Sequence, residues 1–201
     1  MDILGVSQSL DQWRVASFRW RTELALPAKV GLALIMAGLT GLAAQVRVPL
    51  PLTPVPATGQ VFAVLLSGIL LGGAWGGLSQ ALYVGLGAAG LPWFSGWAGG
   101  LPLGPTVGYL IGFIPAAVAV GWASERFVWT RHFVPQIAVM LIGVAIIYAF
   151  GAVGFSLITG ADFGATMRLA VLPFVPGDLA KAVAAAAVAR ALLPKRARGG
   201  Q

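Results

Sequence analysis

The stretch YVGLGAAGLPWFSGWAGGLPLGPTVGYLIG, residues 83–112, joins two apolar helices through a loop that has no charged side chain. We expect the first helix to end near Gly90. The second should begin at residues 104–106, Gly-Pro-Thr, because proline suits the first helical position. The loop places Trp93 and Trp97 among glycines and prolines. It fits either a lid over a pocket or a plain connection whose tryptophans lie in the aromatic belt of a membrane protein.

Glycine recurs at every fourth position around the start of the second helix, at Gly104, Gly108 and Gly112. One face of that helix therefore has almost no side chains, so another helix can approach it closely. This spacing predicts tight helix–helix packing inside a membrane bundle.

The composition indicates an integral membrane protein. Of the 201 residues, 58% are hydrophobic and only 9% are charged, whereas soluble domains have about 25% charged residues. The chain has no cysteine and one histidine, His132, which excludes disulfides and zinc sites built from these residues. No lysine follows a glycine, so the common phosphate-binding loop of ATPases is absent. We expect no metal and no cofactor.

The pattern of apolar segments predicts an all-α fold with six transmembrane helices in a single domain, residues 1–201. Residues 1–23 fit either a short helix on the membrane surface or a frayed tail, and residues 194–201 form a basic tail. The second and third helices are shorter than the ~20 residues that a straight span needs. The six helices are expected at about 24–45, 59–71, 74–89, 105–123, 134–159 and from 169 or 176 to 193.

The distribution of Lys and Arg predicts that both termini are cytoplasmic in a multi-pass protein of the plasma membrane. Ten of the thirteen basic residues lie near the N-terminus, between the fourth and fifth helices, or near the C-terminus. This is the positive-inside pattern rather than a nucleic-acid-binding surface. The proline-rich loop 46–58, the tryptophan loop 91–103 and the loop before the last helix then share the outer face.

The first helix carries a stripe of small residues, Ala33, Ala37 and Gly41, at intervals of four. Small residues let helices pack closely, either within one chain or between subunits. The stripe is therefore either internal packing or a docking face for another membrane protein.

Asp178 and Lys181 are the acid and base placed well inside an apolar segment, and their spacing of three puts them on one helix face. A charge within the bilayer costs about 2.5–3.5 kcal/mol or more, so such residues usually face a cavity. Pro176 suits the start of this helix, and Asp178 in its first turn suits the helix dipole. The pair is either a functional site or an ion pair that only stabilises the helix.

Four blocks of sequence resemble the BioY family, the biotin-specific substrate-binding (S) components of energy-coupling-factor vitamin transporters. The resemblance covers about residues 27–193. It implies six helices, biotin bound near the outer face under loops 46–58 and 91–103, and both termini inside the cell. It also implies a membrane coupling subunit and ATPase subunits as partners, without which some members of the family work. The four blocks are PVPATGQ (54–60), GAAGLPWF (87–94), GPTVGY (104–109) and FVPGDLAK (174–181).

The resemblance also suggests which residues bind biotin. Biotin offers a carboxylate, a ureido ring with N–H donors and an apolar body, and Asp178, Lys181 and aromatic side chains supply matching groups. Trp93 stands where the family usually has a small aliphatic residue. The chain has no asparagine, which the family's pocket loop often offers. The expected binding residues are Asp178, Lys181, Trp93, Ser95, Trp97, Tyr109, Tyr83, Gln60 and Thr58, with Ser95, Trp97 or Tyr109 in place of the asparagine.

Other functions remain open from the sequence. An S component for another vitamin, such as thiamine, would prefer several acids around its cationic ligand. An intramembrane enzyme could use Asp178, but an aspartyl protease needs two acids and a Gly-x-Gly-Asp turn, and here the turn reads Val-Pro-Gly-Asp (175–178). A transporter that works alone would favour an inverted repeat, which we do not see. We expect a transport protein and no enzyme.

Overall fold

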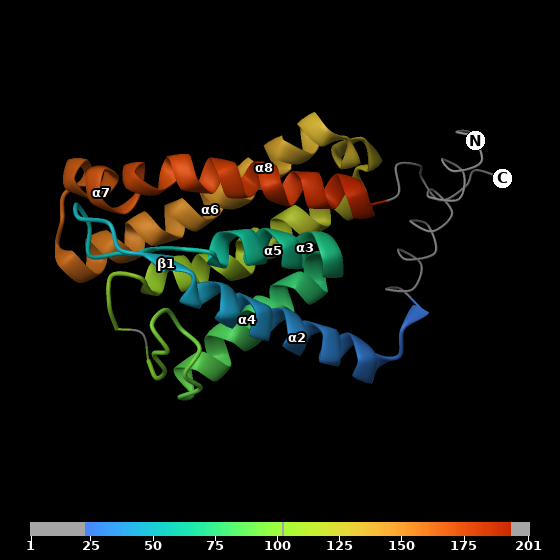
Figure 1. Cartoon of the computed structure of the whole chain (residues 1–201), viewed down its shortest axis with the longest axis horizontal. Helices are drawn as coiled ribbons and strands as arrows, with labels where there is room; N and C mark the ends of the chain where they lie inside the picture. The colour runs from blue at the N-terminus through green and yellow to red at the C-terminus, as the bar shows by residue number, and fades with distance from the viewer. Residues whose placement is uncertain (1–22, 102, 194–201) are drawn as a thin grey trace.

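A computed structural model describes residues 23–101 and 103–193. The expected surface helix at the N-terminus, apart from residue 23, and the basic tail at 194–201 lie outside these residues. In the described part, the six predicted helices are present and form one elongated bundle (Figure 1). They are α2 (Leu26–Gln45), α3 (Gln60–Leu71), α4 (Gly73–Ala88), α5 (Val107–Arg126), α6 (Phe133–Thr159) and α8 (Val175–Leu192).

The segment before α8 differs from the prediction of one continuous last helix or a plain loop. It contains a separate short helix, α7 (Phe163–Ala170), and a 3-10 turn, η2 (Leu172–Phe174). Asp162 caps α7, since its Oδ1 accepts a hydrogen bond from the Ala165 N–H at 2.7 Å. Another 3-10 turn, η1 (Val128–Arg131), lies between α5 and α6.

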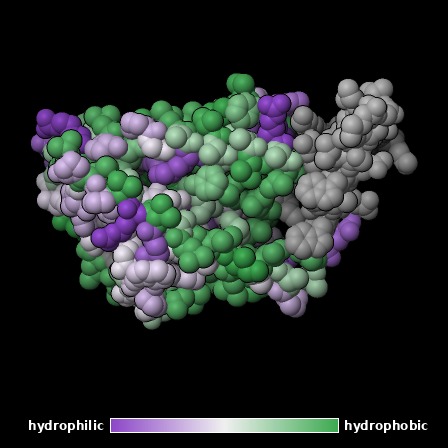
Figure 2. All heavy atoms as spheres, in the orientation of Figure 1, coloured by the Kyte–Doolittle hydropathy of each residue, from purple (hydrophilic) through white to green (hydrophobic). Residues whose placement is uncertain are grey.

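Four helical stretches of the described chain are long and apolar enough to cross a membrane: Leu26–Gln45, Val107–Arg126, Phe133–Thr159 and Phe163–Leu192. The helices α3 and α4 have only 12 and 16 residues. Hydrophobic side chains cover the middle of the bundle, and hydrophilic ones gather at the end that carries α7 (Figure 2). By composition and helix length, the chain is thus a multi-pass membrane protein. The lengths of α3 and α4 do not by themselves support the predicted count of six spans.

The proline-rich loop, with prolines at 49, 51, 54 and 56, contains no helix. Its two ends pair as short antiparallel strands, β1 (Arg47–Val48) and β2 (Ala57–Thr58), with Arg47 opposite Thr58. Figure 1 shows β1, α7 and the loop before α5 at the same end of the bundle.

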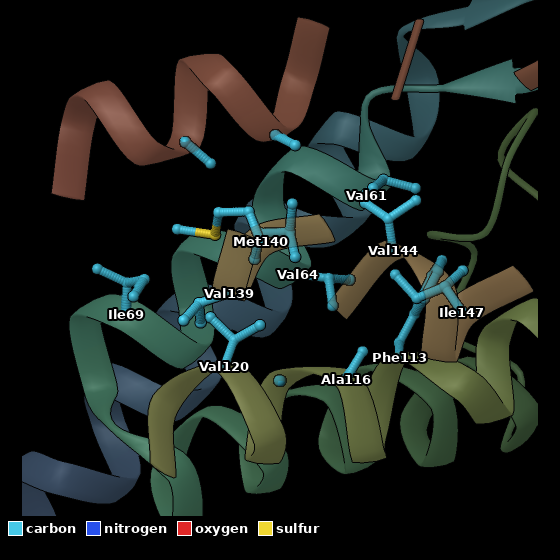
Figure 3. Packing of buried hydrophobic residues seen from close by; sticks show 14 of the residues in the cluster. Val61, Val64, Ile69, Phe113, Ala116, Val120, Val139, Met140, Val144 and Ile147 are labelled. Carbon is cyan, nitrogen blue, oxygen red and sulfur yellow. The ribbon is translucent and has the colours of Figure 1, made fainter. Parts of the chain in front are cut away.

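The main core lies between α3, α5 and α6. Figure 3 shows Val64 of α3, Val120 of α5 and Met140 of α6 pointing toward one another. Val64 and Met140 are fully buried. Closely packed aliphatic side chains of this kind fix the three helices at their mutual angles.

Close approach of α5 to α6 depends on the predicted glycine repeat at two of its three positions. A Cβ on Gly108 would stand 2.2 Å from the Phe150 carbonyl oxygen, and one on Gly112 would stand 2.9 Å from the Phe150 Cβ. Gly104 precedes α5 and would meet nothing within 4 Å. The repeat therefore serves packing only where it lies inside the helix.

Buried polar side chains connect α2, α3 and α4. The Gln80 Nε2 donates to the Thr40 hydroxyl at 3.2 Å and to the Ser67 hydroxyl at 3.1 Å. Gln60 donates to the Tyr83 hydroxyl at 2.8 Å. Polar groups at membrane depth need such partners, and Gln60, Gln80 and Tyr83 are all buried.

The small-residue stripe of α2 packs within the chain, which is the first of the two alternatives that its spacing left open. Ala33 and Ala37 are 0% exposed within the chain. Gly41 is buried as well, and a Cβ on it would stand 3.0 Å from the Trp93 Cβ. Small residues permit close approach, but their spacing does not say which neighbour approaches.

We expect Gly108→Ala to destabilise the protein, because its methyl group would overlap the α6 backbone. Overpacking of this kind costs about 1–3 kcal/mol. Gly31→Ala on α2 is the matched control, since a Cβ there would meet nothing within 4 Å. Thermal unfolding in detergent measures both variants. Equal melting temperatures for Gly108→Ala and Gly31→Ala would contradict the packing of α5 on α6.

Candidate functional site

A cavity of about 370 Å³ lies beside the β1–β2 end of the bundle. Its volume is within the range of small-molecule sites, about 300–1,000 Å³. Loop 46–58, loop 91–103 and the helices α3, α5, α6 and α8 all contribute to its lining. The loops that the sequence analysis placed on one face therefore do border one cavity.

Asp178 carries the most buried charge of the cavity lining. It lies in the first turn of α8, two residues after Pro176, and is 3% exposed. The Lys181 ammonium donates to its Oδ1 at 2.7 Å, and the Tyr148 hydroxyl of α6 donates to its Oδ2 at 2.8 Å. Each carboxylate oxygen thus has a donor, and the helix dipole adds favourable potential at this end of α8.

Aromatic side chains form much of the remaining wall. Phe113 and Tyr109 come from α5, and Phe174 comes from the turn before α8. The Tyr109 and Phe174 rings lie edge to face with their centroids 6.2 Å apart, and the Tyr109 hydroxyl donates to the Ala170 carbonyl oxygen. These contacts fix Tyr109 against α7, so the wall is apolar and preformed.

Gln45, at the end of α2, fixes the base of the tryptophan loop. Its Nε2 donates to the Phe94 carbonyl oxygen at 3.0 Å, and its Oε1 accepts from the Trp97 N–H at 3.0 Å. Phe94 and Ser95 then line the cavity, together with Gly99, Gly100 and Leu101 further along the loop. The Ser95 hydroxyl oxygen is buried and has no hydrogen-bond partner in the described part of the chain.

Six of the nine expected binding residues line the cavity, and three do not. Tyr83 is 0% exposed and lies behind the wall, where Gln60 donates to its hydroxyl. Trp93 donates from Nε1 to the Tyr83 carbonyl oxygen at 2.9 Å. Trp97 is 62% exposed and has φ +60°. The six that do line it are Thr58, Gln60, Ser95, Tyr109, Asp178 and Lys181.

The cavity lining also includes residues that were not expected from the sequence, namely Arg47, Phe94 and Tyr148. Tyr148 could have been found, because it is the one polar residue in the apolar run from 137 to 155. Arg47 could have been found because it is a basic residue in a loop expected on the outer face, where the positive-inside pattern predicts few basic residues.

Asp178 is the one acid among the lining residues of the described chain. Asp162, which directly precedes α7, caps that helix instead. The two-acid arrangement of an intramembrane aspartyl protease is therefore not present at this cavity. A buried carboxylate with aromatic walls is suited to binding a compact molecule that carries N–H donors.

Comparisons with known proteins agree on one family. A family model described as "BioY family" matches residues 17–198. The chain is 44% identical over 143 residues to the probable biotin transporter BioY of Methanothermobacter thermautotrophicus, covering 67% of this chain and 91% of the relative. It is 35% identical over 181 residues to the biotin transporter BioY of Rhizobium etli, covering 82% and 95%.

A solved structure shares the fold. The crystal structure of the S-component for biotin from an ECF-type ABC transporter superposes with a TM-score of 0.76, covering 84% of this chain and 94% of that chain. The sequence identity is 23%, so this likeness concerns the arrangement of the helices.

Proposed function

The chain belongs to the BioY family, and from this we propose that it binds biotin for uptake as the S component of an energy-coupling-factor transporter. The observation that carries the proposal is the buried Asp178, held by Lys181 and Tyr148, in an aromatic cavity under two loops. The relatives named as biotin transporters span most of this chain, which supports the same ligand here.

Biotin matches the cavity in chemistry. Its ureido N–H groups need a hydrogen-bond acceptor, and a carboxylate such as that of Asp178 is a strong one. Its fused rings and alkyl chain need apolar surface, which Tyr109, Phe113 and Phe174 offer. Lys181 bonds to Asp178 directly, so its proposed role is to orient and neutralise that carboxylate.

The proposal includes the surroundings of the protein. We place it in the plasma membrane with both termini cytoplasmic and the cavity open to the outer face, in accord with the positive-inside pattern. A membrane coupling subunit and ATPase subunits are its proposed partners. No catalytic role is proposed, because Asp178 has both oxygens engaged and no second acid beside it among the lining residues.

We expect Asp178→Asn to weaken biotin binding about ten- to a hundredfold. Hydrogen bonds to a charged group are worth about 1.5–3 kcal/mol, and each 1.4 kcal/mol is a factor of ten in affinity. Lys181→Met should weaken biotin and biotin methyl ester equally, because Lys181 acts through Asp178. Isothermal titration of the purified protein in detergent measures the dissociation constants.

The matched control for Asp178→Asn is Asp162→Asn, which removes an acid outside the cavity and should leave biotin affinity unchanged. Thermal unfolding of each variant separates loss of binding from loss of folding. Near-wild-type affinity in folded Asp178→Asn and Lys181→Met would show that the pair only stabilises α8, and the proposed site would be wrong.

The topology has its own test, since the chain has no cysteine. Leu52→Cys lies in the proline-rich loop and Trp129→Cys lies between α5 and α6, and these positions are 74% and 62% exposed. In intact cells, a membrane-impermeant maleimide should label Leu52→Cys and should label Trp129→Cys only after lysis. The reverse pattern would overturn the proposed orientation.

A further inference from the structure

A second cavity, of about 270 Å³, lies where α6 begins and α8 ends. The other ends of these two helices are joined through α7, so this cavity lies at the end of the bundle opposite α7 (Figure 1). The proposed function makes no use of it. The residues that line it are His132, Phe133, Val134, Pro135 and Arg190.

The polar side chains of this second cavity are basic, and none of its lining residues in the described chain is an acid. The Arg190 guanidinium carbon lies 5.6 Å from the centre of the Phe133 ring, a cation–π contact that holds the side chain over the start of α6. Arg190 makes no ion pair with another described residue. Its N–H donors are therefore open to an anionic group from outside the chain.

His132 adds a further donor beside Arg190. It directly precedes α6, its side chain is exposed, and it does not cap the helix. An imidazole ring has an N–H donor whether it is neutral or protonated. Guanidinium and imidazole donors on one cavity are suited to the oxygens of a phosphate group, to which the positive end of the α6 dipole also contributes.

The cavity lies at the boundary of the membrane. Both helices belong to stretches long and apolar enough to cross a bilayer, so their ends lie near the lipid headgroups. Exposed aromatic side chains gather at the same end, where Phe127 packs against Trp122 and Trp129 with ring centroids 5.6 and 6.2 Å apart. Tryptophan is enriched at this level of the membrane. Val134, which lines the cavity, is 75% exposed and offers apolar surface to a lipid chain.

The sequence adds positive charge close to this end. Lys195, Arg196 and Arg198 follow Arg190 within eight residues. Basic residues that immediately follow a membrane helix on its cytoplasmic side attract anionic lipids. In the proposed orientation the end of α8 is cytoplasmic, so the charge pattern favours an anionic phospholipid over a zwitterionic one.

We infer that this second cavity binds the phosphate of an anionic phospholipid in the cytoplasmic leaflet. Arg190, held by Phe133, donates to the phosphate oxygens, and His132 donates beside it. An acyl chain of the lipid lies along Val134. The inference goes beyond biotin binding and takes only the orientation of the chain from the proposed function.

The inference predicts that the purified protein prefers phosphatidylglycerol to phosphatidylcholine with the same acyl chains. Native mass spectrometry of the protein in detergent, with equal amounts of both lipids, should show a preference of about fivefold, because the choline group brings a positive charge to Arg190. Arg190→Gln should remove most of this preference, and Arg190→Lys should keep part of it. His132→Ala should reduce it about twofold, since one neutral donor is lost.

Arg126→Gln is the matched control. Arg126 is an exposed arginine in the last turn of α5, at the same end of the bundle, and does not line the cavity. It should leave the lipid preference unchanged. Biotin affinity should be unchanged in every variant, because the two cavities have no lining residue in common, and this shows that the variants are folded. The preference of the wild-type protein needs no variant.

Three outcomes would overturn the inference. Equal retention of the two lipids by the wild-type protein would leave no anionic lipid site. Equal loss of preference in Arg126→Gln and Arg190→Gln would show general attraction to the basic end of the bundle rather than binding in the cavity. Release of bound phosphatidylglycerol by excess inorganic phosphate would assign the cavity to a soluble anion. A wild-type protein that retains phosphatidylglycerol but does not bind biotin would contradict the proposed function and leave the lipid site in place.

Discussion

The site depends on an ion pair that an apolar helix bundle could not bury alone. Removing a carboxylate from water costs several kcal/mol unless its oxygens are paired and hydrogen-bonded. At Asp178, Lys181 supplies the opposite charge one turn along α8, and Tyr148 of α6 supplies a hydroxyl. The geometry therefore requires α6 and α8 to lie side by side, and the rest of the fold holds them there. Each carboxylate oxygen can accept a second hydrogen bond, which is what a ligand with N–H donors needs.

The two loops that border the cavity, 46–58 and 91–103, are positioned by close packing with α2. The tryptophan loop meets α2 where Gly41 leaves room for Trp93, and Gln45 binds the loop backbone one turn later. The strand β1 follows α2 directly, so the same helix end positions both loops at the cavity. Small residues on α2 thus act on the site through packing within the chain, although they lie outside the cavity lining.

The helices and the charged pair could be predicted from the sequence, because both depend on local chemistry. Long apolar runs bounded by glycine and proline predicted the six helices correctly. The charges of Asp178 and Lys181 inside such a run predicted that these residues face a cavity. The loop side chains could not be predicted, since their directions depend on tertiary contacts. Trp97 turns outward at a positive φ, and Trp93 finds the Tyr83 carbonyl oxygen behind the wall. The spacing of the stripe on α2 could not decide its neighbour, because small residues pack equally well within a chain and between chains.

The central claim is that the polar head of biotin binds at Asp178, in the buried end of the cavity. The most direct measurement is an experimental structure of the purified protein with biotin bound. The account predicts the ureido nitrogens within hydrogen-bond distance of the Asp178 carboxylate, with the Asp178–Lys181 pair intact. Biotin bound with its carboxylate at Lys181 and its ureido ring at the rim, or bound outside the cavity, would contradict the account.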